Sequence, residues 1–88
     1  MYVRSFSYQY EDYDEKVGVL YETDEKMFVK LSISCNECTL SANREGLLAL
    51  AKSLIKLADA NVPKGSHFHL DSPVFMKDGS AELIIDKI

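Results

Sequence analysis

The chain has 88 residues, of which 47% are hydrophobic and 27% are charged. This balance is ordinary for a folded protein, so it excludes wholesale disorder, and the length supplies material for one hydrophobic core. The longest uninterrupted apolar run, Leu47–Ala51, is far shorter than the ~20 residues of a membrane-spanning helix. No apolar signal segment appears at the amino terminus. We therefore expect a single cytoplasmic domain over residues 1–88, with no membrane partner.

Three segments within residues 1–40 alternate as β-strands do. Tyr2–Tyr10 and Val17–Glu22 alternate in part. Lys26–Cys35 alternates most clearly, and its apolar face comprises Met27, Val29, Leu31, Ile33 and Cys35. The pattern predicts an N-terminal antiparallel β-meander.

A long amphipathic helix is predicted over residues 43–61. Its apolar stripe recurs every three or four residues and comprises Leu47, Leu50, Ala51, Leu54, Leu57 and Ala58. Asn43 is the expected N-cap, because its side chain can accept a hydrogen bond from the first turn. Gly46 costs about 1 kcal/mol relative to alanine inside a helix, so we expect it either to tolerate close packing or to let another backbone segment approach. Pro63 prevents the helix from continuing.

Two further strands, His67–Asp71 and Ala81–Ile88, form a predicted C-terminal pair within residues 67–88. The resulting order is βββαββ. It predicts an α+β domain, with an antiparallel sheet of about five strands and the long helix packed on one face. One helix covers only part of one face, so an apolar second face would be left for a partner or a second copy.

The excess negative charge is confined to the first third of the chain. The net charge is −4. Residues 1–26 hold seven acidic and three basic residues, which gives −4, whereas residues 27–88 hold seven of each. Four of the acids lie within Glu11–Glu15, with Tyr10 and Tyr13 interleaved. This pattern is typical either of a solvated turn or of a contact surface for a basic protein. Nucleic acid is not expected, because its phosphates would be repelled.

Cysteine and histidine pairs leave several interpretations open. Cys35 and Cys38 have C-x-x-C spacing, which a structural, a redox or a metal-binding pair can share. His67, His69 and Asp71 point to the same side of a strand, as metal ligands, a partner face or a solvated face would. We favour structural cysteines and expect neither a metal nor another cofactor. No nucleophile elbow or phosphate loop is present, so we do not expect an enzyme.

The C-terminal half resembles a known family. The segments that carry the resemblance are Ala42–Leu48 (ANREGLL) with the predicted helix that follows it, Val62–Asp71 (VPKGSHFHLD) and Ser80–Ile85 (SAELII). Over roughly residues 41–88 they are similar to the immunity protein 32 family of bacterial polymorphic toxin systems. The resemblance implies a non-enzymatic inhibitor that is made beside its cognate toxin and binds it. It does not extend to residues 1–40 or to the cysteine pair.

Charge and resemblance together predict a toxin inhibitor that occludes a basic, nuclease-like active site. The residues expected to bind the toxin are Tyr10, Glu11, Asp12, Tyr13, Asp14, Glu15, His67, His69 and Asp71. Two alternatives remain. One is a homodimeric interaction module. The other is a small metal-binding or redox protein that uses Cys35 and Cys38, or His67 and His69.

Overall fold

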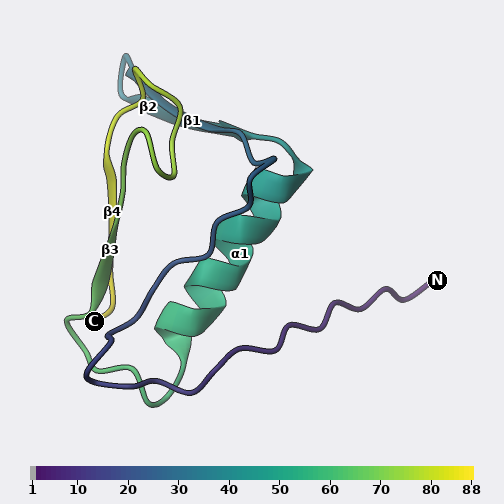
Figure 1. The fold of residues 1–88 in the computed structure, drawn as a ribbon. Coiled ribbons are helices and arrows are strands. Elements are labelled where there is room, and N and C mark those ends of the chain that lie inside the picture. Colours follow the sequence, from purple (N-terminus) through teal and green to yellow (C-terminus); the bar gives the residue numbers. More distant parts are fainter. Residues whose placement is uncertain (1) are drawn as a thin grey trace.

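The computed structural model describes residues 2–88 and places one helix beside two pairs of strands (Figure 1). The predicted α+β class is confirmed. In chain order the elements are β1 (Val29–Ser34), β2 (Glu37–Ala42), α1 (Arg44–Ala58), β3 (His67–Leu70) and β4 (Leu83–Asp86).

The prediction of one five-stranded sheet is wrong. The strands form two separate antiparallel sheets, β1 with β2 and β3 with β4. Leu31 lies opposite Leu40 in the first, and Phe68 lies opposite Ile85 in the second. Strand β2 was not predicted, because its sequence ECTLSA lacks a strong apolar alternation and most of its side chains are exposed.

Two backbone hydrogen bonds link β1 to the segment that leads into β4. The amide of Lys77 donates to the carbonyl of Val29 at 2.8 Å, and the amide of Ala81 donates to that of Leu31 at 3.0 Å. Residues 77–81 thus lie along the edge of β1 that β2 leaves free. A turn closed by the Ser80 amide and the Lys77 carbonyl at 3.1 Å separates the two bonds. This turn interrupts the ladder, so a continuous sheet does not form.

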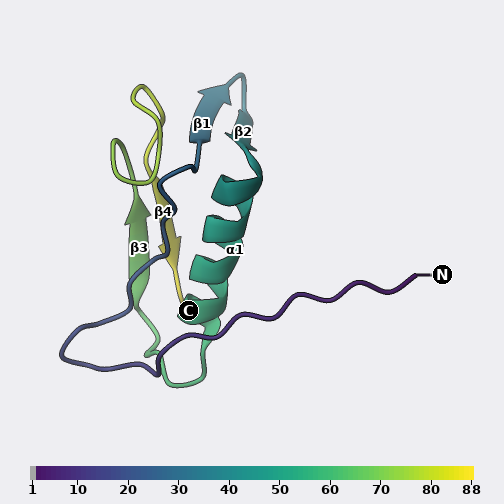
Figure 2. The same cartoon turned by 45° about the vertical axis from the view of Figure 1, so that its right-hand side comes forward.

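The predicted strands Tyr2–Tyr10 and Val17–Glu22 are also absent. The only bridge before β1 in the described chain joins Asp14 and Gly18. Residues 17–28 rise between α1 and the β3–β4 pair (Figures 1 and 2). This region is held by side chains rather than by a strand ladder. For example, the Glu22 amide donates to the Ser53 hydroxyl of α1 at 2.8 Å.

The first turn of α1 is locked to the start of β1, and the predicted cap is confirmed. Asn43 Oδ1 accepts hydrogen bonds from the amides of Gly46 and Phe28, both at 2.9 Å. Its Nδ2 donates to the carbonyl of Lys26 at 2.9 Å. A Cβ on Gly46 would lie 2.6 Å from the Phe28 carbonyl oxygen and 2.7 Å from Val29 Cγ2. The glycine therefore permits the close approach that the sequence indicated.

The helix ends at Ala58, three residues earlier than predicted, and Asp59 is its C-cap. The ammonium group of Lys87 donates to the carbonyls of Asp59 at 2.7 Å and Val62 at 2.8 Å. A cation at the carboxyl end of a helix also complements the helix dipole. The last turn of α1 is therefore attached to the residue that directly follows β4.

The core contains β-strand and loop side chains on one side and one face of α1 on the other. Its buried apolar members are Val29, Leu31, Ala49, Leu57, Val62, Phe68, Leu70, Phe75 and Met76. Tyr21 contacts Phe68 and Phe75 edge to face, with ring centroids 5.7 and 5.4 Å apart. No helix among residues 2–88 is long and apolar enough to cross a membrane.

Two predicted core faces differ from the observed ones. Helix α1 buries Gly46, Ala49, Ser53 and Leu57. Of the predicted leucine stripe, Leu57 is buried and Leu50 packs against the core while partly buried. On β1 the expected face is buried at Val29 and Leu31, but Ile33 is 67% exposed. Cys35 does not continue this face, because it lies in the β1–β2 turn with φ 48° and is exposed.

Candidate functional site

The acidic segment forms a turn that its own carboxylates stabilise. Asp12 Oδ1 accepts from the amide of Tyr13 at 2.8 Å, and Asp14 Oδ1 accepts from that of Lys16 at 2.9 Å. The Asp14 carbonyl accepts from the amide of Gly18 at 2.8 Å. Two of the predicted contact residues therefore have a structural role as well as a charge.

The turn is attached to the carboxyl end of α1. Asn61 Nδ2 donates to Asp12 Oδ1 at 3.0 Å, and the Tyr10 hydroxyl donates to Asp59 Oδ2 at 2.9 Å. Hydrogen bonds from the Asn61 amide and from Tyr10 lower the pKa of Asp59, and Lys87 lowers it further. The bond to Asp59 in turn raises the pKa of Tyr10. At neutral pH this corner carries an ionised aspartate beside a neutral tyrosine.

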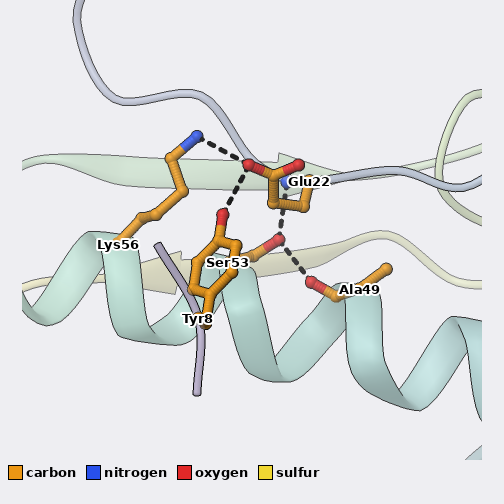
Figure 3. Close-up of polar contacts among 5 residues, drawn as sticks. All are labelled: Tyr8, Glu22, Ala49, Ser53 and Lys56. Carbon is orange, nitrogen blue, oxygen red and sulfur yellow. Dashed lines mark hydrogen bonds and ion pairs between the residues drawn. The ribbon is translucent and has the colours of Figure 1, made fainter. Parts of the chain in front are cut away.

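A second polar cluster ties the N-terminal segment to the middle of α1 (Figure 3). The Tyr8 hydroxyl donates to Glu22 Oε1 at 2.6 Å, and Lys56 Nζ lies 3.2 Å from the same oxygen. Ser53 accepts from the Glu22 amide and donates to the carbonyl of Ala49 at 2.7 Å. The Tyr8 hydrogen bond and then Lys56 lower the pKa of Glu22, despite its partial burial. Burial and the bond to Glu22 raise the pKa of Tyr8.

These two attachments frame a hollow of about 400 Å³. Five of the side chains that line it are carboxylates, and Lys56 is the one cation among the lining residues. Lys56 is already paired with Glu22, so the hollow is strongly negative. Its lining residues are Tyr10, Glu11, Asp12, Tyr13, Asp14, Val17, Gly18, Val19, Leu20, Glu22, Lys56, Asp59 and Val62.

Of the nine predicted contact residues, Tyr10–Asp14 line this hollow and Glu15 is exposed in the adjoining turn. Sequence reasoning missed Glu22, Lys56 and Asp59. Their charges were visible, but Glu22 and Lys56 are 34 residues apart, and no local pattern brings them together. Lys56 and Asp59 are three residues apart at the carboxyl end of α1, and this spacing does not indicate that the N-terminal segment crosses there.

The predicted histidine pair occupies the outer side of β3. His67 and His69 are exposed with ring centroids 5.0 Å apart, whereas Phe68 and Leu70 are buried. His69 Nδ1 lies 2.7 Å from Glu82 Oε1, and His67 Nδ1 lies 3.2 Å from the Gly65 carbonyl oxygen.

The histidines and the acidic segment border adjacent hollows. A second hollow of about 480 Å³ is lined by Val19, Leu20, Tyr21, Thr23, His67, Phe68, His69 and Val74. Val19 and Leu20 line both hollows, so residues 17–23 separate them. Asp71 lines neither. Its carbonyl accepts from the amides of Phe75 at 3.0 Å and Met76 at 3.1 Å, which forms the turn after β3.

The two cysteines lie apart from this region. Cys35 and Cys38 are free thiols, exposed at the tip of the β1–β2 hairpin. Within residues 2–88, no group of three or more histidine, cysteine, aspartate or glutamate side chains is arranged to hold a metal ion.

Comparison with known proteins identifies one family. Residues 37–88, more than half of the chain, match the family model described as immunity protein 32. The matched part contains β2, α1, β3 and β4, whereas the acidic segment and β1 lie outside it. No curated protein and no solved structure matches the chain. On the strength of the family match, the chain belongs to the immunity protein 32 family.

Proposed function

We propose that this immunity protein binds its cognate toxin through the acidic hollow and thereby occludes a basic, nuclease-like active site. Family membership implies the coarser function, which is non-enzymatic neutralisation of a toxin from a polymorphic toxin system. The mode of binding is our proposal. The observation that carries it is the set of five carboxylates around one hollow, with a single cation that is already paired.

The electrostatics of the hollow favour a basic partner. Glu11, Asp12 and Asp14 contribute three negative charges from one segment, and Asp59 adds a fourth from the end of α1. Like charges held this closely repel one another, and an approaching lysine or arginine relieves that repulsion. A concentrated negative patch also accelerates the encounter with a positive surface, by roughly 10- to 1000-fold at low ionic strength. Rapid inhibition suits a protein that must neutralise a toxin made in the same cell.

The shape of the hollow suits the side chain of an arginine or a lysine. Its volume of about 400 Å³ is at the small end of the usual range for ligand sites. Val17, Leu20 and Val62 give it apolar walls, which can pack against the methylene groups of a long basic side chain. Tyr10 lines the hollow, is 37% exposed and offers rigid contact area.

The contact surface extends across residues 17–23 to the histidine hollow. Leu20 is 58% exposed and lines both hollows, so a toxin seated on the acidic side would also contact it. His67 and His69 then lie at the edge of the same footprint. Asp71 lies outside both hollows, and we leave it out of the proposed contact surface.

Co-expression tests the proposal. The chain is expressed with the toxin domain encoded beside it, and the pair is purified through a tag on the toxin. We expect host survival and a stable complex with one immunity protein per toxin. In a parallel culture, Glu11→Gln, Asp12→Asn, Asp14→Asn and Glu15→Gln are combined, and we expect weaker rescue. Full rescue and an equally stable complex with this variant would place the contact surface elsewhere.

A further inference from the structure

Helix α1 has a second apolar face that the protein leaves open to solvent. Its members lie on one side of the helix and are all exposed: Leu47, Ala51, Leu54, Ile55 and Ala58. The exposed fractions of the three large side chains are 52% for Leu47, 42% for Leu54 and 41% for Ile55. The core lies against another face, formed by Gly46, Ala49, Ser53 and Leu57. A helix that is apolar on more than its core-facing side is typical of one that is covered by another element.

We propose that this face is the interface of a homodimer in which two copies of α1 pack antiparallel across a two-fold axis at Ala51. The proposal does not rest on toxin binding, although it shares one residue, Asp59, with the acidic hollow. Alanine on the axis lets the two helices approach closely, at the 8–10 Å that packed helices adopt. Leu47 of one copy then lies against Leu54 and Ile55 of the other, and the same contact recurs across the axis. Such self-complementarity is what a two-fold interface requires.

The charges at the two ends of this face favour the antiparallel arrangement. Arg44 begins the helix and makes no ion pair with any of residues 2–88, and Asp59 follows its last residue. Arg44 and Ala58 are equally distant from Ala51, so each Arg44 lies beside the carboxyl end of the other helix. There it meets the negative end of the helix dipole and the ionised Asp59. A parallel pair would instead bring the two Arg44 side chains together.

The N-terminal tail supplies the remaining contact area. A stable interface buries about 800 Å² on each partner, more than five side chains of one helix offer. The N-terminal end of the described chain extends away from the body on the side of α1 and away from both sheets (Figures 1 and 2). Tyr2, Val3 and Phe6 in this tail are 100%, 87% and 57% exposed. Six extended residues span about 20 Å, which is close to the ~22 Å length of α1. The tail of one copy can therefore lie along the helix of the other.

Analytical ultracentrifugation of the isolated chain tests the dimer. We expect the measured mass to rise with concentration from 9.9 kDa to twice that value. Leu47→Gln with Leu54→Gln should raise the dissociation constant at least tenfold, and Tyr2→Ser with Phe6→Ser should raise it several-fold. The matched control is Ile33→Gln with Val74→Gln, which changes side chains that are 67% and 64% exposed on other elements. The control should dimerise as the unchanged chain does, and circular dichroism should show that every variant is folded.

Cysteine cross-linking tests the arrangement in a background of Cys35→Ser and Cys38→Ser. Ala51→Cys lies on the proposed axis, so oxidation should give a covalent dimer. Two copies of Ala58→Cys would be about 21 Å apart along the antiparallel helices and should not cross-link. Efficient cross-linking through Ala58→Cys would refute the antiparallel arrangement. A chain that stays monomeric at every concentration would refute the dimer. If Leu47→Gln with Leu54→Gln then weakened toxin binding instead, the face would belong to the toxin.

Discussion

Asn43 and Gly46 together hold the start of α1 against the start of β1. The Asn43 carboxamide oxygen accepts from the Gly46 amide and also from the Phe28 amide, at 2.9 Å in each case. Because Gly46 has no side chain, the Phe28 carbonyl can come to within 2.6 Å of the place that its Cβ would occupy. Both residues lie in the part of the chain that matches the family model, and the structure gives both a role in folding.

Gly46→Ala should destabilise the protein even though alanine is the better helix former. The substitution gains about 1 kcal/mol of helix propensity. It also places a methyl group against a backbone oxygen that cannot rotate away, and overpacking of this kind costs about 1–3 kcal/mol. We expect a net loss of up to about 2 kcal/mol in the free energy of unfolding, measured by urea denaturation. Glu45→Ala, in the same turn, should change that free energy by less than about 1 kcal/mol. A stabilised Gly46→Ala variant would contradict the crowded geometry.

Replacing Asn43 should destabilise the protein, both with aspartate, whose side chain can only accept hydrogen bonds, and with apolar alanine. Aspartate is as good an N-cap as asparagine, but it cannot donate to the Lys26 carbonyl as Nδ2 does at 2.9 Å. Asn43→Asp should therefore cost about 1 kcal/mol, the value of one hydrogen bond. Asn43→Ala loses all three bonds and should cost about 2 kcal/mol or more. Thermal unfolding of both variants and of the unchanged protein at one pH gives the order of their stabilities. Equal stability of Asn43→Asp and the unchanged protein would show that the Lys26 bond contributes nothing.

Sequence patterns gave reliable predictions where the cause was local. The Asn43 cap depends on residues within one helical turn, and the alternation of His67–Leu70 depends on a single strand. The orientation of α1 could not be predicted in this way. Its leucines define the stronger apolar stripe, but the close approach of β1 at Gly46 turns the small residues toward the core. That contact joins two segments and leaves no periodic signal.

The N-terminal segment was mispredicted for a different reason. Alternating tyrosines in Tyr2–Tyr10 are typical of a strand, yet their polar tips bind side chains of other elements instead of completing a sheet. Tyr8 reaches Glu22, and Tyr10 reaches Asp59, which is 49 residues away. The charge count located the acidic half of the candidate site. The residues that close it, Lys56 and Asp59, become neighbours of that half only in the folded chain.

Removing the Tyr8 hydroxyl should weaken the protein's stability near neutral pH and flatten its acid dependence. The folded-state pKa of Glu22 lies below its ordinary value of 4.5, mainly because of the Tyr8 hydrogen bond. Glu22 therefore stabilises the fold above pH 4.5, and this contribution is lost as the pH falls through the lowered pKa. The raised pKa of Tyr8 has the opposite sign: the unfolded chain deprotonates first, so stability falls above pH 10.

Tyr8→Phe should reduce the free energy of unfolding at pH 7 by about 1 kcal/mol, because the lost bond is charge-assisted but partly solvated. Urea denaturation at several values between pH 3 and pH 7 should show a smaller slope than in the unchanged protein. Thr39→Val provides the control, since it also removes one hydroxyl group but from an exposed side chain on β2. An unaltered pH slope in Tyr8→Phe would mean that the lysines near Glu22, and not Tyr8, lower its pKa.

Lys87→Met should loosen the carboxyl end of α1. The change keeps an apolar stem but removes the two hydrogen bonds to the Asp59 and Val62 carbonyls. We expect a loss of about 1–2 kcal/mol in stability, together with faster hydrogen exchange of amides near residues 58–62. Lys64→Met changes an exposed lysine nearby and should leave both quantities unaltered. If hydrogen exchange in Lys87→Met rose equally throughout the helix, these two hydrogen bonds would break only in global unfolding. They would then not stabilise the carboxyl end of α1 locally.

The acidic hollow makes a kinetic prediction about toxin binding. Glu11→Gln with Glu15→Gln removes two exposed charges without touching the hydrogen bonds of Asp12 and Asp14 that shape the turn. Association with the toxin should slow several-fold at low salt, and its rate should depend less steeply on ionic strength, while dissociation changes little.

The matched control for this pair is Glu25→Gln with Glu37→Gln, which removes the same charge from exposed positions outside the hollow. Stopped-flow mixing at a series of salt concentrations distinguishes the two variants. If both slow association equally, the net charge of the protein steers the toxin. If only the Glu11 and Glu15 variant does, the toxin approaches the hollow itself, and the position of the charge matters more than its amount.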